Sequence, residues 1–481
     1  MTTELPSDTT PPEAVAHAAE SATPFDEETL VTAWSSRAQV GRSAWRANLR
    51  RPLDFLLTQQ LTKPVTSQQV SNLRAFWLDG VFAAGSDGLV LSYIPLFAVA
   101  YGAAAGQVGV ITSVGNLLAA LALFPGARLL EKMGRSKPLI LWSSTLLYRL
   151  PLLFLALLPL LPGNARFAIP AIIVLFAIRS FGVNLSNPAW TALTAEVVPP
   201  FMRGRYFSLR NLLMGIATLI STPLAGWLIL RLGRNAATPM LGYQVVFALG
   251  MLVGLGSTWY FSRIQEPPLP IKLPLDGGKR RSLFGILQGR PALSAFVLSA
   301  FVWNMALQVA APYFNVYMVT HLGGDAGSVG VVTSISALSA LLGQIVFGRL
   351  MDRKGSVWVF LATGFPIVVL PVAWAFYSNP WQVGVNNLFG GFLWAGFNTA
   401  NFNMLLLLTP DDDRPRAVAL YQTAVFVSAV IGPMIGGYLA DNVSFPLIFM
   451  VSGAGRLVAM IIFVLMGAGA ALAQERRTAT T

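Results

Sequence analysis

The sequence contains no cysteine and only two histidines, His17 and His321. The lack of cysteine excludes disulfide bonds, thiolate metal sites and cysteine nucleophiles. Neither histidine lies within a long apolar stretch, so a histidine metal site or histidine catalysis is not expected. The chain also has no G-x-x-x-x-G-K-[ST] phosphate-binding loop, which argues against a built-in ATPase. We therefore expect no cofactor, no metal and no enzymatic activity.

Charged residues are also scarce, at 11% of the 481 residues, where soluble domains carry about 25%. The mean hydropathy is +0.61, and the apolar residues form blocks of about 20 or more, enough to cross a bilayer core of ~30 Å as helices. A β-barrel would show short alternating segments instead. The composition therefore predicts an all-α polytopic membrane protein with twelve spans. The expected spans are 73–100, 107–127, 138–161, 166–190, 206–230, 241–262, 291–319, 327–348, 357–378, 382–408, 417–440 and 444–470.

The formal charge of +12 is distributed unevenly between the two sides of the predicted membrane domain. Most Lys and Arg residues lie in the N-terminal tail, in the loops that follow even-numbered spans, and at the C-terminus. Only Arg166, Arg231 and Arg234 fall in loops on the other side. By the positive-inside rule both termini are expected in the cytoplasm. The basic charge is thus a topology signal, and no nucleic-acid partner is expected.

The tail, residues 1–72, has a basic segment at 27–51 with the sequence EETLVTAWSSRAQVGRSAWRANLRR. Leu30, Trp34, Trp45 and Leu49 fall near one face of a helix, and arginines accompany them. One interpretation is a helix that lies in the cytoplasmic interface. The other is a solvated basic arm that only enforces topology.

The sequence repeats itself: AGQVGVITSVGNLLAAL at 105–121 aligns without a gap with AGSVGVVTSISALSALL at 326–342. The repeat predicts two six-span halves, a plan known in transporters, with a substrate site between the halves at mid-depth. The expected parts are the halves 73–262 and 291–470, a cytoplasmic linker at 263–290 and a C-terminal tail at 471–481.

The turn after the second span reads ARLLEKMGRSK, 127–137, and the turn after the eighth reads GRLMDRKGS, 348–356. This duplicated turn resembles the loop between helices 2 and 3 of the major facilitator superfamily, roughly G-x-L-x-D-R-x-G-R-K. The resemblance extends over the whole span region and implies a transporter of twelve helices. The matching residues are Glu131, Gly134 and Arg135 in the first copy and Asp352, Arg353 and Gly355 in the second.

These two turns are interpreted as a cytoplasmic latch. An acid at the end of one helix can accept hydrogen bonds from a neighbouring helix N-terminus and from nearby Arg and Lys. Gly134 and Gly355 permit the tight turn. The alternative is that the turns carry positive-inside charge and nothing more.

Two further stretches resemble the superfamily. GPMIGG, 432–437, in the eleventh span, and its looser counterpart TPLAGW, 222–227, in the fifth, are similar to an element that the family associates with antiporters. Ordinary packing of Pro and Gly within helices is an equal interpretation. RGRYFSLRN, 203–211, resembles a sequence of a poorly characterised bacterial branch and implies no substrate.

Charged residues within spans need a partner or a function, because each costs at least ~2.5–3.5 kcal/mol at the bilayer centre. The first span contains Asp79 and Asp87, and the fourth contains Arg179. The resemblance implies that helices 1, 4, 7 and 10 line a central cavity, with Asp87 and Arg179 facing each other. Asp87 is expected either to couple transport to protons or to form a structural ion pair, and Asp79 to be structural. Arg149 and Arg456 are expected to pack or to snorkel.

The seventh and tenth spans carry amide and aromatic side chains at helical spacing. Buried amides are costly without partners, so we expect them to line a wet substrate cavity, with interhelical hydrogen bonding as the alternative. The cavity residues are Asn304, Gln308, Asn315, Asn387, Trp394, Asn398 and Asn401.

Together these features predict a secondary transporter in the lipid bilayer of a bacterial inner membrane. It would move a small, partly polar or amphipathic organic substrate by alternating access, and its expected partners are the substrate and a proton or other coupling ion. A monomer is expected. The alternative is a non-transporting member of the same fold, such as an assembly factor or a lipid-handling protein.

Overall fold

Long helices dominate this computed structural model, and no strand occurs among the residues that it describes. The described ranges are 67–161, 165–199, 202–234, 239–266, 283–409 and 414–480. The segment 27–51, for which an interfacial helix is one interpretation, lies outside them. Residues 71–481 form one compact unit, to which the following description applies.

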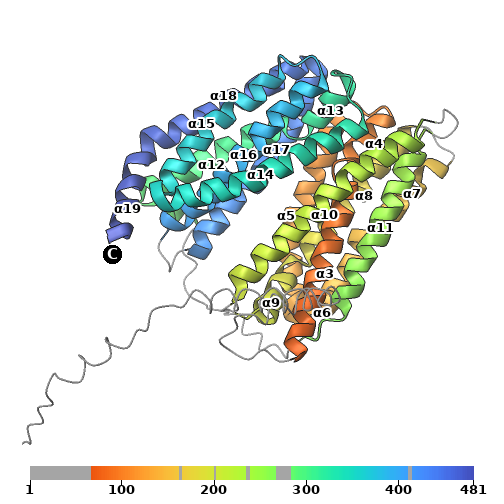
Figure 1. The fold of residues 1–481 in the computed structure, drawn as a ribbon, viewed down its shortest axis with the longest axis horizontal. Coiled ribbons are helices and arrows are strands. Elements are labelled where there is room, and N and C mark those ends of the chain that lie inside the picture. The colour runs from red at the N-terminus through yellow and green to blue at the C-terminus, as the bar shows by residue number, and fades with distance from the viewer. Residues whose placement is uncertain are drawn as a thin grey trace, which may run out of the picture. The chain divides into compact units, whose positions relative to one another are not determined.

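The first half of this unit contains the helices of the first six spans (Figure 1). They are α3 (Ser67–Val90), α4 (Ile94–Ala100), α5 (Ala105–Met133), α6 (Ser136–Trp142), the π-helical η1 (Ser143–Arg149), α7 (Leu150–Leu157), η2 (Leu158–Leu160), α8 (Ala165–Leu185), α9 (Asn187–Val197), α10 (Arg203–Leu232) and α11 (Leu241–Ser262).

The second half contains the helices of the last six spans. Its helices are η4 (Leu283–Leu287), α12 (Pro291–Ala310), α13 (Tyr313–Thr320), α14 (Ala326–Lys354), α15 (Ser356–Trp374), α16 (Pro380–Leu407), α17 (Arg414–Asn442), α18 (Phe445–Phe463), the π-helical η6 (Val464–Ala468) and α19 (Gly469–Thr480).

Among the described residues, 11 helical stretches are long and apolar enough to cross a membrane. The expected span at 382–408 is not among them, although α16 has 28 residues and is long enough. Its four glycines and its asparagines lower its hydropathy. The all-helical class and the two-half organisation that the sequence predicts are confirmed.

The first and seventh spans are each broken into two helices, where the sequence predicted continuous spans. The chain turns at 91–93 between α3 and α4, and at 311–312 between α12 and α13. Pro95 stands in the first turn of α4, and Pro312 is the residue just before α13. Proline has no N–H to donate, so it fits the start of a helix and not its interior.

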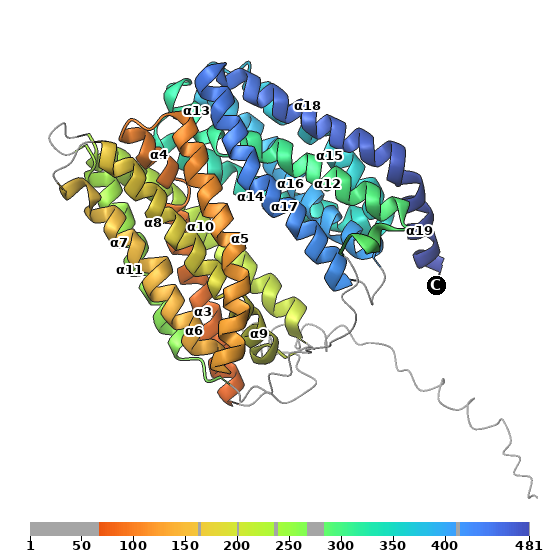
Figure 2. The same ribbon diagram turned by 180° about the vertical axis from the view of Figure 1, so that it is seen from behind.

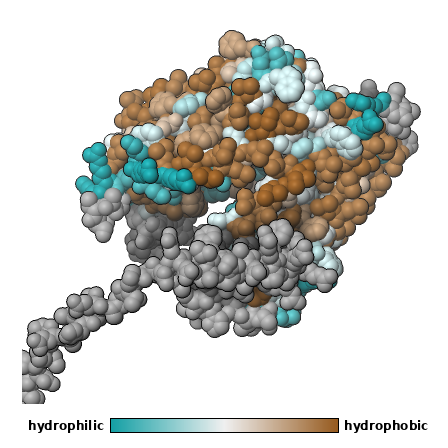
Figure 3. Space-filling model, viewed as in Figure 1, coloured by the Kyte–Doolittle hydropathy of each residue, from teal (hydrophilic) through white to brown (hydrophobic). Residues whose placement is uncertain are grey.

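The outer surface of the helices is largely apolar, as Figure 3 shows for one face. Large hydrophobic side chains are exposed on it, including Phe124, Phe167, Leu342 and Leu465, which are 64%, 78%, 62% and 79% exposed. Such a surface would be a liability in water. It is the surface that a multi-pass membrane protein presents to lipid.

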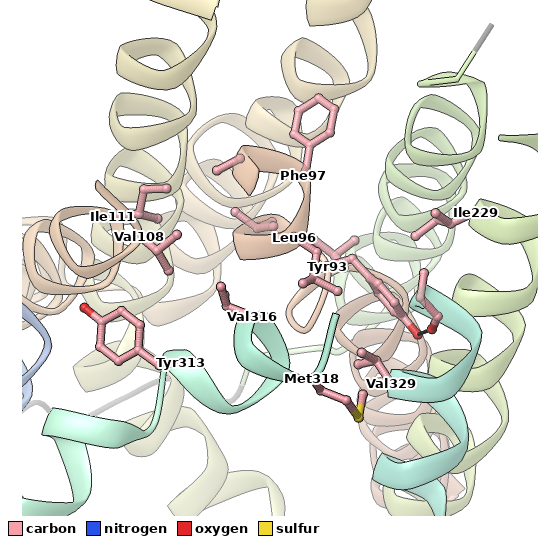
Figure 4. Close-up of a cluster of buried hydrophobic side chains, with 14 of the residues drawn as sticks. Tyr93, Leu96, Phe97, Val108, Ile111, Ile229, Tyr313, Val316, Met318 and Val329 are labelled. Atoms are coloured by element: carbon pink, nitrogen blue, oxygen red, sulfur yellow. Dashed lines mark hydrogen bonds between the residues drawn. The ribbon is translucent and has the colours of Figure 1, made fainter. Parts of the chain in front are cut away.

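One end of the unit is closed by a hydrophobic core that both halves build. Figure 4 shows Tyr93, Phe97 and Val108 from the first half near Tyr313 and Val316 from the second. All five belong to a single buried cluster. This end is called the closed end below, and the contact between the halves is called the seam.

Four hydrogen bonds join the halves across the seam within the described ranges. Two of them use a carbonyl that a helix proline has released, because proline cannot donate to the carbonyl four residues earlier. Pro223 releases Leu219 O, which accepts from Ser334 Oγ at 3.4 Å. Pro433 releases Ala429 O, which accepts from Asn116 Nδ2 at 2.9 Å. The other two bonds are Gly106 N to Asp441 Oδ2 at 2.8 Å and Tyr93 OH to Ala326 O at 3.4 Å.

The opposite end carries the turns at Gly134 and Gly355 and the helix α19, and is called the basic end below. Figures 1 and 2 show the halves meeting near α4 and α13 and diverging toward α9 and α19. The second large hydrophobic core, which includes Ile286 and Ala471, is built by the second half alone. The halves therefore contact each other mainly at the closed end.

Candidate functional site

The carboxylate of Asp87 is the centre of a polar cluster inside the first half. Its Oδ1 accepts hydrogen bonds from Tyr148 OH at 2.6 Å and from Arg179 Nη2 at 2.7 Å. Arg149 Nη1 lies 3.7 Å from the same oxygen. The Asp87 side chain nevertheless stays 30% exposed, whereas that of Arg179 is 4% exposed. The structure thus brings Asp87 and Arg179 together and adds Tyr148 and Arg149.

The π-helical segment η1 explains why two consecutive residues, Tyr148 and Arg149, are both buried inside the bundle. Pro151 has no N–H, so the carbonyl of Leu147 loses its usual α-helical partner. A wider π-turn precedes the proline, and such bulges are frequent at functional sites. As a result the guanidinium groups of Arg149 and Arg179 lie 4.3 and 4.1 Å from the centre of the Tyr148 ring.

The sequence left two expectations for Arg149, packing inside the bundle or snorkelling to the membrane surface, and the structure contradicts the second. It is 2% exposed, and its Nη1 donates to Ser86 Oγ at 3.0 Å. Gly254 on α11 leaves room for it, because a Cβ there would lie 2.5 Å from Arg149 Cδ. The nearby Asp87 carboxylate and the Ser86 hydroxyl make this burial tolerable, since a buried charge needs partners.

Asp79 forms a second cluster two helical turns closer to the basic end. Its Oδ1 accepts from Ser257 Oγ at 2.7 Å, and Arg210 Nη2 lies 3.6 Å from its Oδ2. Gly80 makes space for this arginine, since a Cβ there would lie 2.7 Å from the guanidinium group. Arg210 was not predicted as a site residue, because near the start of its span it resembled an ordinary topology charge.

The stretch 203–211 holds this cluster in place. Arg203 donates to backbone carbonyls at the end of α9. Tyr206 OH donates to Leu73 O at 2.7 Å, and Arg210, one turn later, reaches Asp79. The residues therefore tie α10 to α9 and α3, which is a structural reason for the pattern.

The two carboxylates line one cavity of ≈ 320 Å³, called the acidic cavity below. Arg149 and Arg210 line it as well, and Tyr148 forms part of its wall. All of its lining residues belong to the first half.

A second cavity of ≈ 340 Å³, called the arginine cavity below, lies in the second half. Three of the residues predicted to line the substrate cavity, Asn315, Asn387 and Trp394, line it together with Arg456. Every lining residue belongs to the second half, and none of them is acidic.

The other four predicted cavity residues are not among the lining residues of this cavity. Asn304 Nδ2 donates to Ala300 O of its own helix at 2.7 Å. Asn401 Nδ2 donates to Tyr421 OH on α17 at 2.7 Å, so interhelical bonding is the better interpretation for it. Gln308 is half-buried, and Asn398 is exposed.

The predicted latch residues surround the turns at the basic end. Gly134 and Gly355 have φ of +61° and +86°, values that favour glycine. The charged side chains are exposed and make no hydrogen bond or ion pair with the residues that the structure describes; they are Glu131, Arg135, Asp352 and Arg353.

Two other acids occupy the helix N-termini at these turns. Glu266 Oε1 accepts from the backbone N–H of Ser136, the first residue of α6, at 2.6 Å. Glu475 Oε1 accepts from the backbone N–H of Ser356, the first residue of α15, at 2.5 Å. A carboxylate there satisfies free N–H groups and complements the helix dipole. Neither glutamate was predicted, although the dipeptide Gln-Glu recurs at 265–266 and 474–475 and was available as a signal.

Two repeated helical halves, a seam closed at one end and buried charges facing internal cavities are the architecture of a membrane transporter. The match to a family model identifies it further. The model of the Major Facilitator Superfamily matches residues 76–319 and 305–477. The chain belongs to this superfamily.

Two relatives are named for multidrug resistance. The chain is 25% identical over 397 residues to the multidrug resistance protein MdtG of Citrobacter koseri, covering 79% of this chain and 91% of the relative. It is 26% identical over 393 residues to the multi-drug resistance efflux pump PmrA of Streptococcus pneumoniae, covering 79% and 91%.

Solved structures share the fold. A bacterial homologue of the iron transporter ferroportin, in an inward-facing state, matches with a TM-score of 0.62 and 15% identity, covering 84% of this chain and 99% of that one. The inward-open xylose transporter XylE from E. coli matches with a TM-score of 0.60 and 16% identity, covering 83% and 95%. At these identities the likeness concerns the fold alone.

Proposed function

We propose that this protein exports small amphipathic organic solutes by alternating access, driven by protons that bind at Asp87. The observation that carries the proposal is the Asp87 carboxylate. It lies near the middle of a span, is held by Arg179 at 2.7 Å, and is still 30% exposed. Ionisable groups in such positions mark ion pathways in membrane proteins.

The geometry gives a physical route for coupling. Protonation of Asp87 removes the negative charge that holds the guanidinium groups of Arg179 and Arg149. Proton binding and release of Arg179 are therefore expected to occur together. Asp87 lies on α3 and Arg179 lies on α8. Protonation of Asp87 with release of Arg179 therefore changes a contact between two helices that the superfamily places beside the central cavity.

The seam supplies the moving part. It is closed by apolar packing and four hydrogen bonds in the described residues, a contact that can separate without breaking either half. Alternating access requires that the closed end opens while the basic end closes. We place the basic end on the cytoplasmic side of a bacterial inner membrane, on the positive-inside rule.

The latch remains part of the proposal. Glu131 and Asp352 are exposed and unpaired in the described ranges, with the halves apart at the basic end. They are free to accept hydrogen bonds from the partner half when this end closes. The glutamates at the helix N-termini, Glu266 and Glu475, would keep both turns rigid in either state.

Export of amphipathic compounds is the reading that the relatives favour. Two of them are named for multidrug resistance or efflux and align over most of this chain. The same names favour transport over a non-transporting assembly factor or lipid-handling protein.

The test uses proteoliposomes with an imposed pH gradient and a panel of sugars, amino acids, aromatic carboxylates and lipophilic cations. Wild type should accumulate at least one amphipathic compound against its gradient, and Asp87→Asn should lose gradient-driven accumulation. Asp79→Asn is the matched control, because it removes the other carboxylate of the same cavity. Accumulation that is the same in wild type and Asp87→Asn would refute the coupling role.

A further inference from the structure

Arg456 on α18 is a buried cation without a counter-ion. It is 2% exposed, and no hydrogen bond or ion pair joins its guanidinium group to any residue that the structure describes. Its Nε is buried and has no hydrogen-bond partner. Because an isolated buried charge is strongly unfavourable, this arrangement calls for an anion from outside the described chain.

The other buried arginines in the spans show what is missing. Arg179 and Arg149 lie 2.7 and 3.7 Å from Asp87, and Arg210 lies 3.6 Å from Asp79. The second half thus contains the same kind of cation as the first half, but no carboxylate beside it.

The guanidinium group of Arg456 faces the arginine cavity, of ≈ 340 Å³. Small-molecule sites have volumes of about 300–1,000 Å³, so this cavity has room for a small organic molecule. Amides and hydroxyls line one part, including Asn315, Asn387 and Ser336, and none of the lining residues is acidic.

The remaining wall is aromatic and aliphatic, with Phe314, Trp374 and Trp394 among its residues. The Arg456 guanidinium lies 5.7 Å from the centre of the Trp394 ring and 5.9 Å from that of Trp303. These rings position the cation through cation–π contacts and leave its N–H donors free for a ligand.

We infer that the arginine cavity binds the carboxylate of a small aromatic or aliphatic organic acid. One guanidinium group matches one negative charge and can bind a carboxylate through two parallel hydrogen bonds. The apolar wall accommodates the body of the molecule, which distinguishes an organic acid from an inorganic ion. The inference deepens the proposed function, on which it rests for its meaning in transport, by naming the class of solute.

The test measures binding to the purified full chain in lipid nanodiscs by calorimetry. Benzoate is the probe, benzyl alcohol its uncharged analogue and chloride the inorganic anion. Wild type should bind benzoate, and Arg456→Gln should weaken binding about 10- to 100-fold, as expected for loss of a hydrogen bond to a charged group. Arg456→Lys keeps the charge but not the paired donors, so its affinity for benzoate should fall between those of wild type and Arg456→Gln. Arg263→Gln is the control, because Arg263 also lies over a tryptophan ring, at 3.7 Å from Trp259, but is exposed and outside the cavity.

Several outcomes would overturn the inference. They are equal affinity for benzoate and benzyl alcohol, chloride competing with benzoate at equal concentration, and an unchanged affinity in folded Arg456→Gln. If that variant does not fold, Asn387→Leu keeps Arg456 and should still weaken benzoate binding several-fold, and an unchanged affinity would count against the site. Binding without transport would leave this site in place and refute the proposed function, whereas proton-coupled transport with no benzoate binding would do the reverse.

Discussion

The hydrogen bond from Asn116 to the carbonyl of Ala429 offers a direct perturbation of the seam. Asn116→Leu has a similar volume and removes the donor at 2.9 Å from this carbonyl. Pro433 cannot supply an N–H in its place. The closed end should therefore be weakened, while the packing within each half is left intact.

The expected magnitude follows from one neutral hydrogen bond, which contributes about 1 kcal/mol. A change of this size alters the ratio of two conformations roughly fivefold. The population should shift away from the state in which the halves are apart at the basic end.

The absence of cysteine makes the assay clean, because a pair of introduced cysteines will carry the only spin labels. We would place them at Met133 on α5 and Val418 on α17, which are exposed at the basic end of the two halves. Electron–electron distance measurements should show more short distances in Asn116→Leu than in the parent. The control is Asn184→Leu, where the lost bond reaches Ser180 O of the same helix. Indistinguishable distance distributions for the parent and Asn116→Leu would refute the role given to the seam.

Two further variants test other parts of the structure. Glu475→Ala should lower the free energy of unfolding by about 1 kcal/mol, the usual effect of losing a helix cap, and Asp352→Ala should change it little. Thermal melts followed by tryptophan fluorescence measure both variants. A larger loss of stability in Asp352→Ala than in Glu475→Ala would contradict the capping geometry. Gly254→Ala should reduce transport, because its Cβ would lie 2.5 Å from Arg149 Cδ. Gly215→Ala should not reduce transport, because a Cβ there has no neighbouring atom within 4 Å. Equal transport rates in the two variants would contradict the role given to the contact between Gly254 and Arg149.

The repeat and the apolar blocks were enough to predict the class and the two halves, and the resemblance to the superfamily predicted that Asp87 faces Arg179. These features depend on periodicity, on composition and on resemblance to a family, which can all be read from one sequence. The breaks at 91–93 and 311–312 lie beside Pro95 and Pro312. Whether a proline starts a new helix or stays inside a continuous one depends on the hydrogen-bond partners that the surrounding backbone carbonyls find. A single sequence does not show these partners.

The remaining site residues could not be predicted because their roles depend on distant partners. Arg210 resembled a topology charge until Asp79 and Gly80 were seen beside it. Glu475 lies more than a hundred residues from the helix that it caps. The asparagines of the tenth span share a helical spacing, yet Asn401 donates a hydrogen bond to Tyr421 and Asn387 lines a cavity. Helical spacing alone does not say which neighbouring element covers each face of a helix.

The central claim is that protons enter the transport cycle at Asp87. The most direct test follows a pH-sensitive dye inside proteoliposomes while a transported compound is added, with wild type, Asp87→Asn and Asp79→Asn compared at equal protein content. The account predicts substrate-dependent proton movement in wild type and in Asp79→Asn, and none in Asp87→Asn. Proton movement that persists in Asp87→Asn and disappears in Asp79→Asn would contradict it and assign the coupling to the other carboxylate.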